Sequence, residues 1–357
     1  MQFADYIKLY IPKINKAIKS IFDRKINSVE NSFLLDYYKE LRDYFLAGGK
    51  RIRPLIGIAT YNAFSRNDDK VIIPNVGVEF LHNASLVHDD IIDKDDFRRG
   101  KPAFHYRFRQ YHSNYNLKKM VAQDFGTNIG IIGGDSAFFL GLEAFLYNDF
   151  SKELNFRAID YYKKAFIEIS DGVLIEIDMV NQKELTMEEY IKMVSLKTGA
   201  LIEKSMLIGA NYAEVQKTNP KLVEHISIYG KNLGIIFQII DDILGSFGDE
   251  KKTGKPTDGD IREGKKTCLL ITSLDVLEEQ KKQQLAQLIE SPNMSENDVN
   301  EVKDLFKEAD APKICQRLAD MYFRQAQNAL EELGQFIYKD EIEFFHDLLK
   351  FVIERTF

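Results

Sequence analysis

The sequence contains an acidic segment, LVHDDIIDKDD, at residues 86–96. Five of the eight residues from 89 to 96 are aspartates, and the segment before them, 76–87, is largely apolar. The pattern therefore predicts an acidic cluster at the end of a buried helix. Asp89 and Asp93 are four residues apart, which places both carboxylates on one helix face. Two like charges there destabilise a helix unless a cation lies between them, and carboxylates without His or Cys partners favour magnesium.

A second acidic pair lies 152 residues further on, in the segment FQIIDDIL at 237–244. Asp241 and Asp242 also follow a long apolar stripe, so we expect them to end a second buried helix. Two such pairs indicate facing helices that present carboxylates across a cavity, as in metal sites at the core of helical bundles. From these residues alone, helix capping and solvated surface charge stay open as the alternative.

Basic residues gather in three segments: GGKRIRP at 48–54, RRGKP at 98–102 and the Gly- and Lys-rich loop 248–266. Glycine N–H groups beside cations suit a phosphate, and arginine forks bind phosphate oxygens in pairs. The spacing of a P-loop is absent from the first segment. The first and third segments could instead be solvated loops without a ligand, and the second could be paired with Asp95 and Asp96 on the surface. Together with the aspartates, the three segments predict a diphosphate cavity with magnesium on its walls and cations at its rim.

Composition limits the class of protein. The 357 residues include 48 basic and 55 acidic side chains, and the formal net charge of −7 argues against a general nucleic-acid binder. Cys268 and Cys315 are too few for a disulfide framework or a cysteine zinc site, so we expect buried thiols in a reducing compartment. No secretory signal is visible, and the most membrane-like stretch, 129–147, contains Asp135 and Glu143. We therefore expect a cytoplasmic protein without a transmembrane segment.

Apolar residues recur at helical spacing along most of the chain. They predict helices around residues 7–18, 201–210, 222–240 and 337–352, whereas strand-like alternation is short and isolated. Ser291–Asn300 reads as a surface connection that contains a helix cap at Ser295. No Ser/Gly-rich linker divides the chain. The sequence thus predicts an all-α protein with one domain over residues 1–357.

In combination, these motifs resemble those of trans-isoprenyl diphosphate synthases, the polyprenyl synthetase family, and are similar to its geranylgeranyl diphosphate synthases. The resemblance extends from about Gly48 to about Lys266. It implies a single large antiparallel helical bundle around a central cavity, usually a homodimer. It also implies a magnesium-dependent prenyltransferase that condenses isopentenyl diphosphate with an allylic diphosphate in sequential 1′-4 steps. The motifs follow the family's order: GGKRIRP at 48–54, DDIID at 89–93, RRGKP at 98–102, Lys197-Thr198, FQIIDD at 237–242 and GKP at 254–256.

The resemblance also implies roles for individual residues. Those similar to the isopentenyl diphosphate site are Lys50, Arg53, His82 and Arg99. Those similar to contacts of the allylic diphosphate are Arg98, Lys197, Thr198, Gln238, Lys255 and Lys265. Direct magnesium ligands would be Asp89, Asp93 and Asp241, supported by Asp90 and Asp242, for about three ions in each site. The residues expected to act in catalysis are Asp89, Asp93, Lys197, Thr198, Gln238 and Asp241.

Two features depart from the family pattern. The second acidic motif often reads DDxxD, but Gly245 stands at its last position here. We expect Asp249 or Asp260 to help hold the metal or the lysine loop. The insert 107–123 is longer than in the shortest members, and we expect no role for it beyond a lid or a dimer contact.

Product length depends on what closes the floor of the cavity. Ala84 and Ser85 lie one turn before Asp89, where short-chain members often carry a bulky aromatic residue that blocks elongation. Two small residues predict a product of C20 or longer, C20–C25 rather than C15. Phe80, Leu81 or residues of another helix or subunit are alternative plugs.

Two other functions are weighed against this one. A class I terpene cyclase shares the helical fold but needs no isopentenyl diphosphate pocket, so Lys50, Arg53 and Arg99 argue against it. A non-catalytic partner subunit of another synthase would be expected to lose aspartates that this chain retains.

Overall fold

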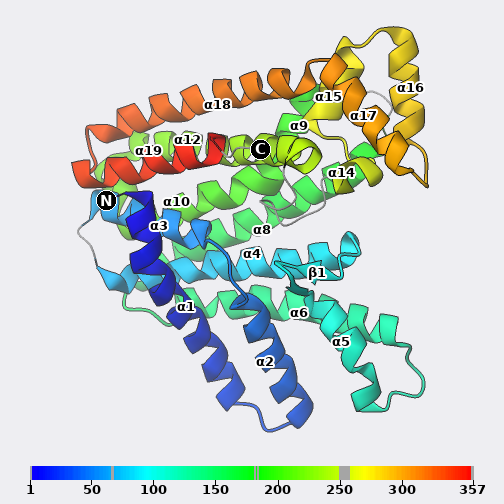
Figure 1. The fold of residues 1–357 in the computed structure, drawn as a ribbon. Coiled ribbons are helices and arrows are strands. Elements are labelled where there is room, and N and C mark those ends of the chain that lie inside the picture. The colour runs from blue at the N-terminus through cyan, green and yellow to red at the C-terminus, as the bar shows by residue number, and fades with distance from the viewer. Residues whose placement is uncertain (1, 66–67, 181, 183–184, 249–257, 355–357) are drawn as a thin grey trace. The chain divides into compact units, whose positions relative to one another are not determined.

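The computed structural model describes residues 2–65, 68–180, 182, 185–248 and 258–354. Within these ranges the chain consists of helices, their connections and one antiparallel pair of two-residue strands, β1 (Phe97–Arg98) and β2 (Lys101–Pro102), as Figure 1 shows. The predicted all-α class is therefore confirmed.

By its internal contacts the chain forms two compact units. Unit 1 comprises Met1–Lys163 and Ser205–Pro220, and unit 2 comprises Lys164–Lys204 and Lys221–Phe357. The helices α8 (Lys152–Val180) and α10 (Ala200–Tyr212) contribute residues to both units. One domain over residues 1–357 remains a prediction.

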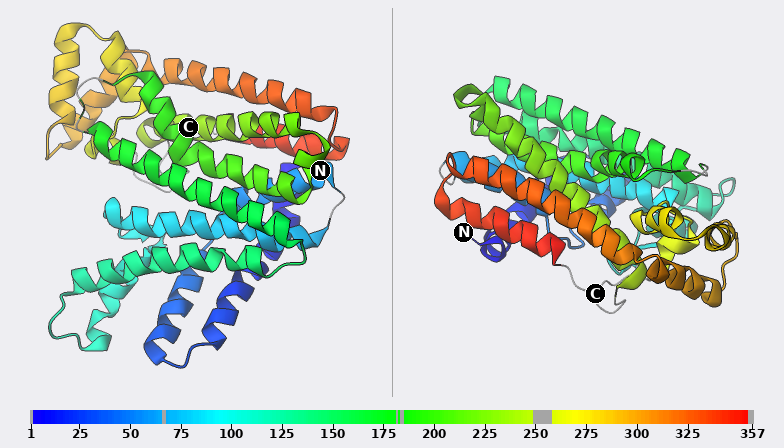
Figure 2. Two further views of the ribbon diagram at one scale, coloured as in Figure 1. Left: turned by 180° about the vertical axis from the view of Figure 1, so that it is seen from behind. Right: turned by 90° about the horizontal axis from the view of Figure 1, so that it is seen from above.

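Unit 1 is built around α4 (Ile72–Ile92), the helix that leads to the first acidic motif. It packs most extensively against α6 (Ala122–Gly141), and the front and rear views show the two helices side by side (Figures 1 and 2). Helices α1, α3 and α5 contact α4 as well. The other elements of the unit are α1 (Phe3–Asn27), α2 (Ser32–Phe45), α3 (Ile52–Phe64), η1 (Asp69–Val71), α5 (Phe104–Tyr111), η2 (His112–Tyr115), α7 (Glu143–Leu146) and α11 (Val215–Thr218).

Glycines let α6 approach its neighbours closely. A Cβ at Gly134 would lie 2.1 Å from Nε2 of His88, and one at Gly133 would lie 2.4 Å from the ring of Phe104. His88 also forms a hydrogen bond with the carbonyl of Ile131 (3.0 Å). Its ring therefore fastens the end of α4 to α6 and fixes the position of the first acidic motif.

Unit 2 contains the helix that carries the second acidic motif, α12 (Pro220–Phe247). Helix α9 (Met187–Val194) leads into a π-helical turn, Ser195–Gly199, before α10 begins. The remaining helices of the unit are α14 (Gly259–Arg262), α15 (Cys268–Val276), α16 (Glu279–Ile289), α17 (Glu296–Glu308), α18 (Ala311–Gly334) and α19 (Lys339–Ile353).

The helices predicted from apolar spacing are present. The stripes at 7–18, 201–210, 222–240 and 337–352 fall in α1, α10, α12 and α19, respectively. Ser295 caps α17 as expected, through a capping box with Asp298. However, the helix begins at Glu296, so the surface connection is shorter than predicted.

The second acidic pair differs from its predicted place at a helix end. Asp241 and Asp242 lie inside α12, which continues to Phe247. The helix extends because Ile243 and Ser246 are buried and continue its inward face.

Two rows of apolar side chains remain exposed. The stretch Ala122–Leu146 is long and apolar enough to cross a membrane, a test that core helices of soluble proteins also pass. Its exposed residues include Ile132 and Phe139 on α6. A separate row on α8 includes Leu174 and Ile177. Exposed apolar faces of this kind are typical of surfaces that a partner covers.

Candidate active site

The first acidic motif lies at the C-terminal end of α4, where Asp93 caps the helix. The N–H of Asp93 donates to the carbonyl of Asp89 (2.8 Å), so the two residues stack one turn apart on one face, as predicted. Asp89 is partly exposed and Asp93 is exposed, whereas Asp90 is fully buried. The three aspartates therefore have different surroundings.

Asp90 is held by side chains of the protein. Its Oδ2 accepts a hydrogen bond from the hydroxyl of Tyr44 (2.9 Å), and its Oδ1 accepts one from Nε of Arg98 (2.6 Å). The same oxygen forms an ion pair with Nη2 of Arg98 (2.5 Å). Burial raises the pKa of Asp90, although Arg98 and Tyr44 act to lower it. Burial and the Asp90 charge raise the pKa of Tyr44 well above its usual range, so its hydroxyl stays protonated and donates.

The first two basic segments come together in unit 1. The guanidinium of Arg99 lies over the glycine loop, with its Cζ 3.2 Å from where a Cβ of Gly49 would be, and its Nη1 donates to the carbonyl of Gly48 (2.8 Å). The two glycines have φ of 113° and 112°, a backbone region that other residues rarely adopt. Lys50, which follows this loop, is exposed, and Arg53 is partly buried.

Arg51 supports this loop from within the protein. Its side chain forms a buried ion pair with Glu79 of α4 (Nη1–Oε1, 2.7 Å) and donates from Nη2 to the carbonyl of Phe45 (2.6 Å). Removing either partner of such a pair leaves an unpaired buried charge. The pair thus fixes the position of the loop that carries Lys50 and of the first turn of α3, which carries Arg53.

His82 lies on α4 beside this basic group. Burial lowers its pKa well below the usual range, and the charges of Arg53, Arg99 and Arg51 lower it further. The imidazole is therefore neutral near pH 7, and the arginines create a positive region around it. The residues predicted for isopentenyl diphosphate thus share one part of unit 1.

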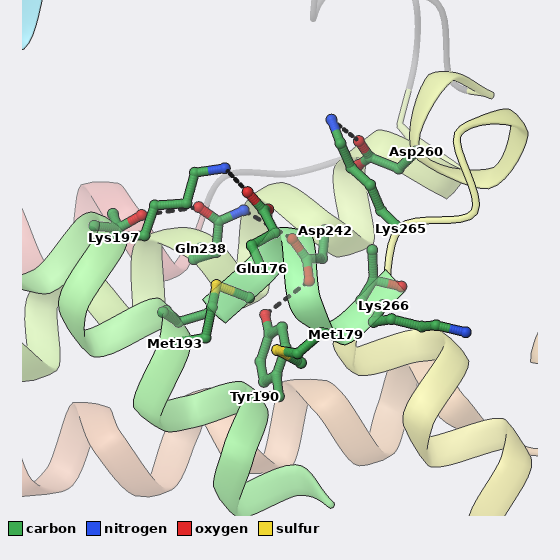
Figure 3. A pocket seen from close by; sticks show the side chains of 13 residues that line it. Glu176, Met179, Tyr190, Met193, Lys197, Gln238, Asp242, Asp260, Lys265 and Lys266 are labelled. Carbon is green, nitrogen blue, oxygen red and sulfur yellow. Dashed lines mark hydrogen bonds and ion pairs between the residues drawn. The ribbon is translucent and has the colours of Figure 1, made fainter. Parts of the chain in front are cut away.

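Unit 2 holds a pocket lined by predicted residues from α12, the π-helical turn and the segment before α15, as Figure 3 shows. Those residues are Lys197, Thr198, Gln238, Asp242 and Lys265. Two residues that were not predicted, Glu176 of α8 and Tyr190 of α9, also line it.

Gln238 connects both sides of this pocket. Its Oε1 accepts a hydrogen bond from Oγ1 of Thr198 (3.1 Å), and its Nε2 donates to Oδ1 of Asp242 (2.8 Å). The second oxygen of Asp242 accepts from the hydroxyl of Tyr190 (2.7 Å) and from the backbone N–H of Cys268 (3.2 Å). Five residues are thereby linked in one network, most of which Figure 3 marks with dashed lines.

Burial governs the protonation of Asp242. Together with the nearby Asp260 charge, it raises the pKa of Asp242 to about 7, against hydrogen bonds from Gln238 and Tyr190 that lower it. The pocket therefore has a low-dielectric floor below its charged groups.

Lys197 pairs with a carboxylate of the same pocket. Its ammonium forms an ion pair with Glu176 of α8. Close approach of the two elements requires Gly172, because a Cβ there would lie 2.5 Å from the backbone nitrogen of Lys197. The π-helical turn places Lys197 and Thr198, neighbours in sequence, on one pocket. Such turns are frequent at functional sites.

Asp260 stands close to the departure from the family pattern. A Cβ at Gly245 would lie 2.7 Å from Oδ2 of Asp260, so this carboxylate occupies the space that a side chain at the last motif position would need. Its Oδ1 lies 3.4 Å from Nζ of Lys265, in agreement with the expected role beside the lysine loop. Asp249 and Lys255 lie outside the described residues.

The donor set fits magnesium. The candidate ligands are carboxylate oxygens, and in the described ranges no three His, Cys, Asp or Glu side chains form a cage for a metal. Magnesium is typically bound through one or two carboxylates and substrate phosphates, without such a cage. Because protein donors occupy both oxygens of Asp90 and of Asp242, these two carboxylates are poorly suited to direct ligation.

Three residues of the site were missed by sequence reasoning: Tyr44, Tyr190 and Glu176. Their partners lie 46, 52 and 21 residues away along the chain, and no short-range spacing signals contacts at such separations. Charge was the one available signal, since Glu176 is acidic within a largely apolar segment.

Known proteins are similar to this chain in sequence and in fold. The polyprenyl synthetase family model matches residues 36–308, so the chain belongs to that family. It is 33% identical over 300 residues to a short chain isoprenyl diphosphate synthase of Methanocaldococcus jannaschii, covering 84% of this chain and 82% of the relative. It is 31% identical to a geranylgeranyl diphosphate synthase of Sulfolobus acidocaldarius, covering 99% and 98%.

Solved structures of proteins with related names have a similar fold. A geranylgeranyl pyrophosphate synthase of Corynebacterium glutamicum, complexed with isoprenyl diphosphate and magnesium, has a TM-score of 0.89 at 26% identity, covering 100% of both chains. The geranylgeranyl pyrophosphate synthetase of Pyrococcus horikoshii has a TM-score of 0.78 at 32% identity, covering 97% of this chain and 99% of that one. The chain has the isoprenoid synthase fold and is a prenyltransferase that elongates prenyl diphosphates.

Proposed function

We propose that this protein catalyses the magnesium-dependent, sequential 1′-4 condensation of isopentenyl diphosphate with an allylic diphosphate. The product is an all-trans polyprenyl diphosphate of C20–C25, and diphosphate is released. Relatives named geranylgeranyl and geranylfarnesyl diphosphate synthases support this product range.

One observation on α4 carries the proposal. His82, at the centre of the arginine group, and Asp89 are seven residues apart, so they lie on the same helix face about 10 Å from each other. Cations at one position of the helix and carboxylates two turns away suit two anionic groups that lie side by side. Arginine and lysine would bind one of these groups directly, and the carboxylates would bind the other through metal. An allylic and a homoallylic diphosphate meet that requirement.

The residues of unit 2 suit the ionisation of the allylic substrate. The C–O bond breaks as diphosphate leaves, and Lys197 and Lys265 stabilise the charge that gathers on it. Asp89, Asp93 and Asp241 would hold magnesium, which would supply further neutralisation of the leaving group's charge. The carbonyl region of Lys197-Thr198 and the side chain of Gln238 would stabilise the allylic cation through their dipoles.

Carbon–carbon bond formation then follows without a side-chain base. The double bond of isopentenyl diphosphate, held by Lys50, Arg53 and Arg99, attacks C1 of the allylic cation. Loss of a proton restores a double bond, and the released diphosphate takes that proton. Burial, together with the neighbouring arginines, lowers the pKa of His82 and keeps its ring neutral, so it binds as a hydrogen-bond partner rather than as a cation.

The residues before Asp89 support a product longer than C15. Ser85 is partly exposed and its hydroxyl donates back to the carbonyl of His82 (2.8 Å), whereas Ala84 is fully buried. Phe80 is committed to core packing, since its ring stacks 5.2 Å from that of Phe22. No bulky side chain therefore stands at positions 84 and 85.

Ser85→Phe is the sharper test of this floor. We expect the variant to shorten the main product, while Ser85→Ala leaves it unchanged. Phenylalanine at Ala84 would overpack a closed core at a cost of about 1–3 kcal/mol, so a change there would mix folding with product length. A folded Ser85→Phe enzyme with the wild-type product profile would contradict the floor assignment.

The activity is tested with the purified protein, radiolabelled isopentenyl diphosphate, an allylic diphosphate and magnesium, followed by chromatography of the products. We expect C20–C25 products and loss of turnover with EDTA or in Asp89→Ala. Asp304→Ala, an exposed aspartate of α17, is the control. A dominant C15 product would overturn the predicted length, and turnover by Asp89→Ala would overturn the metal assignment.

A further inference from the structure

We propose that Tyr44 and Tyr190 are positioning residues that hold the second aspartate of each acidic motif inside the protein, so that the first aspartate faces the metal. The inference rests on the proposed function, because it assigns these tyrosines a role in metal-dependent substrate binding. Neither tyrosine touches substrate in this scheme, and both act through an aspartate.

In unit 1 the contact is formed between α2 and the end of α4. Tyr44 is buried, and its ring packs against Phe104 (6.2 Å between centroids), so the phenol has a fixed direction. Its hydroxyl donates to Oδ2 of Asp90 (2.9 Å), while Arg98 occupies Oδ1. Neither oxygen of this buried carboxylate lacks a donor.

In unit 2 the same arrangement recurs with different elements. Tyr190 of α9 is buried and donates to Oδ2 of Asp242 (2.7 Å). Oδ1 accepts from the amide of Gln238 (2.8 Å), as Figure 3 shows. The second carboxylate again has donors at both oxygens, one of them a tyrosine from a preceding helix.

The recurrence argues against ordinary core packing. In both motifs the tyrosine contacts the second aspartate, and in both the neighbouring first aspartate is more exposed. Successive residues of a helix point about 100° apart, so fixing the second side chain sets the direction of the first. Partners of this kind, which orient ligands without touching the metal, typically change metal affinity by about 10–100-fold when removed.

The experiment compares Tyr44→Phe and Tyr190→Phe with two matched controls. Tyr162→Phe and Tyr229→Phe also remove the hydroxyl of a buried tyrosine, but those hydroxyls donate to the carbonyls of Phe138 (2.7 Å) and Phe345 (2.7 Å), away from the acidic motifs. The probe is a non-reactive thiodiphosphate analogue of the allylic substrate, titrated calorimetrically with magnesium or with EDTA. Thermal unfolding of each variant is measured alongside.

We expect Tyr44→Phe and Tyr190→Phe to bind the analogue about tenfold more weakly in magnesium and as wild type does in EDTA. The controls should bind as wild type in both buffers. In turnover, the two variants should need more magnesium for half-maximal rate. Wild-type affinity in magnesium for the two variants, or an equal loss in the controls, would overturn the proposal.

A second pair of variants tests the proposal in case a tyrosine variant does not fold. Asp242→Asn keeps the size and one oxygen acceptor for Tyr190, whereas Asp241→Asn removes a direct ligand. We expect Asp242→Asn to weaken magnesium-dependent analogue binding less than Asp241→Asn does, because asparagine still accepts from Tyr190 but no longer accepts from Gln238. Equal losses would overturn the proposal. Failure of the wild-type protein to make any product would instead overturn the proposed function, so the two failures are distinguishable.

Discussion

In the proposed scheme, Glu176 competes with the allylic diphosphate for Lys197. The two side chains form an ion pair in the pocket of unit 2 and are 27% and 29% exposed, so water screens the contact. A diphosphate that binds Lys197 must displace Glu176, and the energy of the pair is lost in that step. Pairs of this exposure contribute about 0.2–1 kcal/mol.

Glu176→Gln should therefore tighten binding of the allylic substrate. We expect its KM to fall about two- to fivefold, which follows from the energy of an exposed pair. The KM for isopentenyl diphosphate should not change, because Glu176 pairs with Lys197, which is not among the residues proposed to bind that substrate. Steady-state kinetics with each substrate varied in turn measures both values.

The control for this prediction is Glu214→Gln, which breaks an exposed ion pair with Lys217 outside the pocket. It should leave both KM values at the wild-type level. If Glu176→Gln raised the KM for the allylic substrate, Glu176 would be a ligand of that substrate or its metal and not a competitor.

For single residues, the sequence predicted the spacing of the candidate ligands but not the side chains that hold them in place. Asp89 and Asp93 are four apart, and that spacing alone places both on one face. Arg51 instead reads as one more cation of a basic loop, although its ion pair with Glu79 is buried. Such a distinction depends on which side chains the fold encloses, and local spacing does not encode it.

The apolar stripes predicted which helices exist, but they predicted poorly where each helix ends. The stripe of α12 was predicted, but its length beyond Asp242 was not. The π-helical turn at Ser195–Gly199 was not predicted either, because tertiary contacts shape it. A Cβ at Gly234 would lie 2.4 Å from Cα of Gly199, so α12 presses directly on this turn.

The contact between α12 and α14 yields a prediction about Gly245. Gly245→Asp would bring a second carboxylate into the space of Asp260, so we expect a loss of stability of about 1–3 kcal/mol and lower activity. The additional substitution Asp260→Ala should restore part of the lost stability and part of the lost activity, because one carboxylate then remains in that space. Chemical denaturation and turnover of the two single variants and the double variant give the coupling between the sites.

Asp258→Ala serves as the control for the second substitution. Asp258 lies two residues from Asp260 and pairs with Arg262, so it should not rescue Gly245→Asp. Additive losses in the Gly245→Asp, Asp260→Ala double variant would show that the two positions do not share this space.

For the molecule as a whole, the net charge of −7 says little about the ligand. The informative charges are local, since the cations gather around His82 and beside Gln238 while the sum stays acidic. The all-α class was predicted from apolar periodicity over many helices, so an error in the assignment of one segment does not change the class. The surface available to a partner did not follow from periodicity, because α6 is apolar on several faces and its exposed residues cannot be told from its buried ones by spacing.

The exposed row on α6 predicts the assembly state. We expect a homodimer that covers this row, since Phe139 is 74% exposed. A glutamate at this position would be buried in the dimer interface without a partner for its charge. Phe139→Glu should raise the dimer dissociation constant by at least about 100-fold, equivalent to ~2.7 kcal/mol, measured by analytical ultracentrifugation across a concentration series. Phe336→Glu, at a side chain 53% exposed in unit 2, should leave the dimer intact. A wild-type protein that sediments as a monomer, or a Phe139→Glu variant as tightly dimeric as wild type, would show that another surface or no partner covers α6.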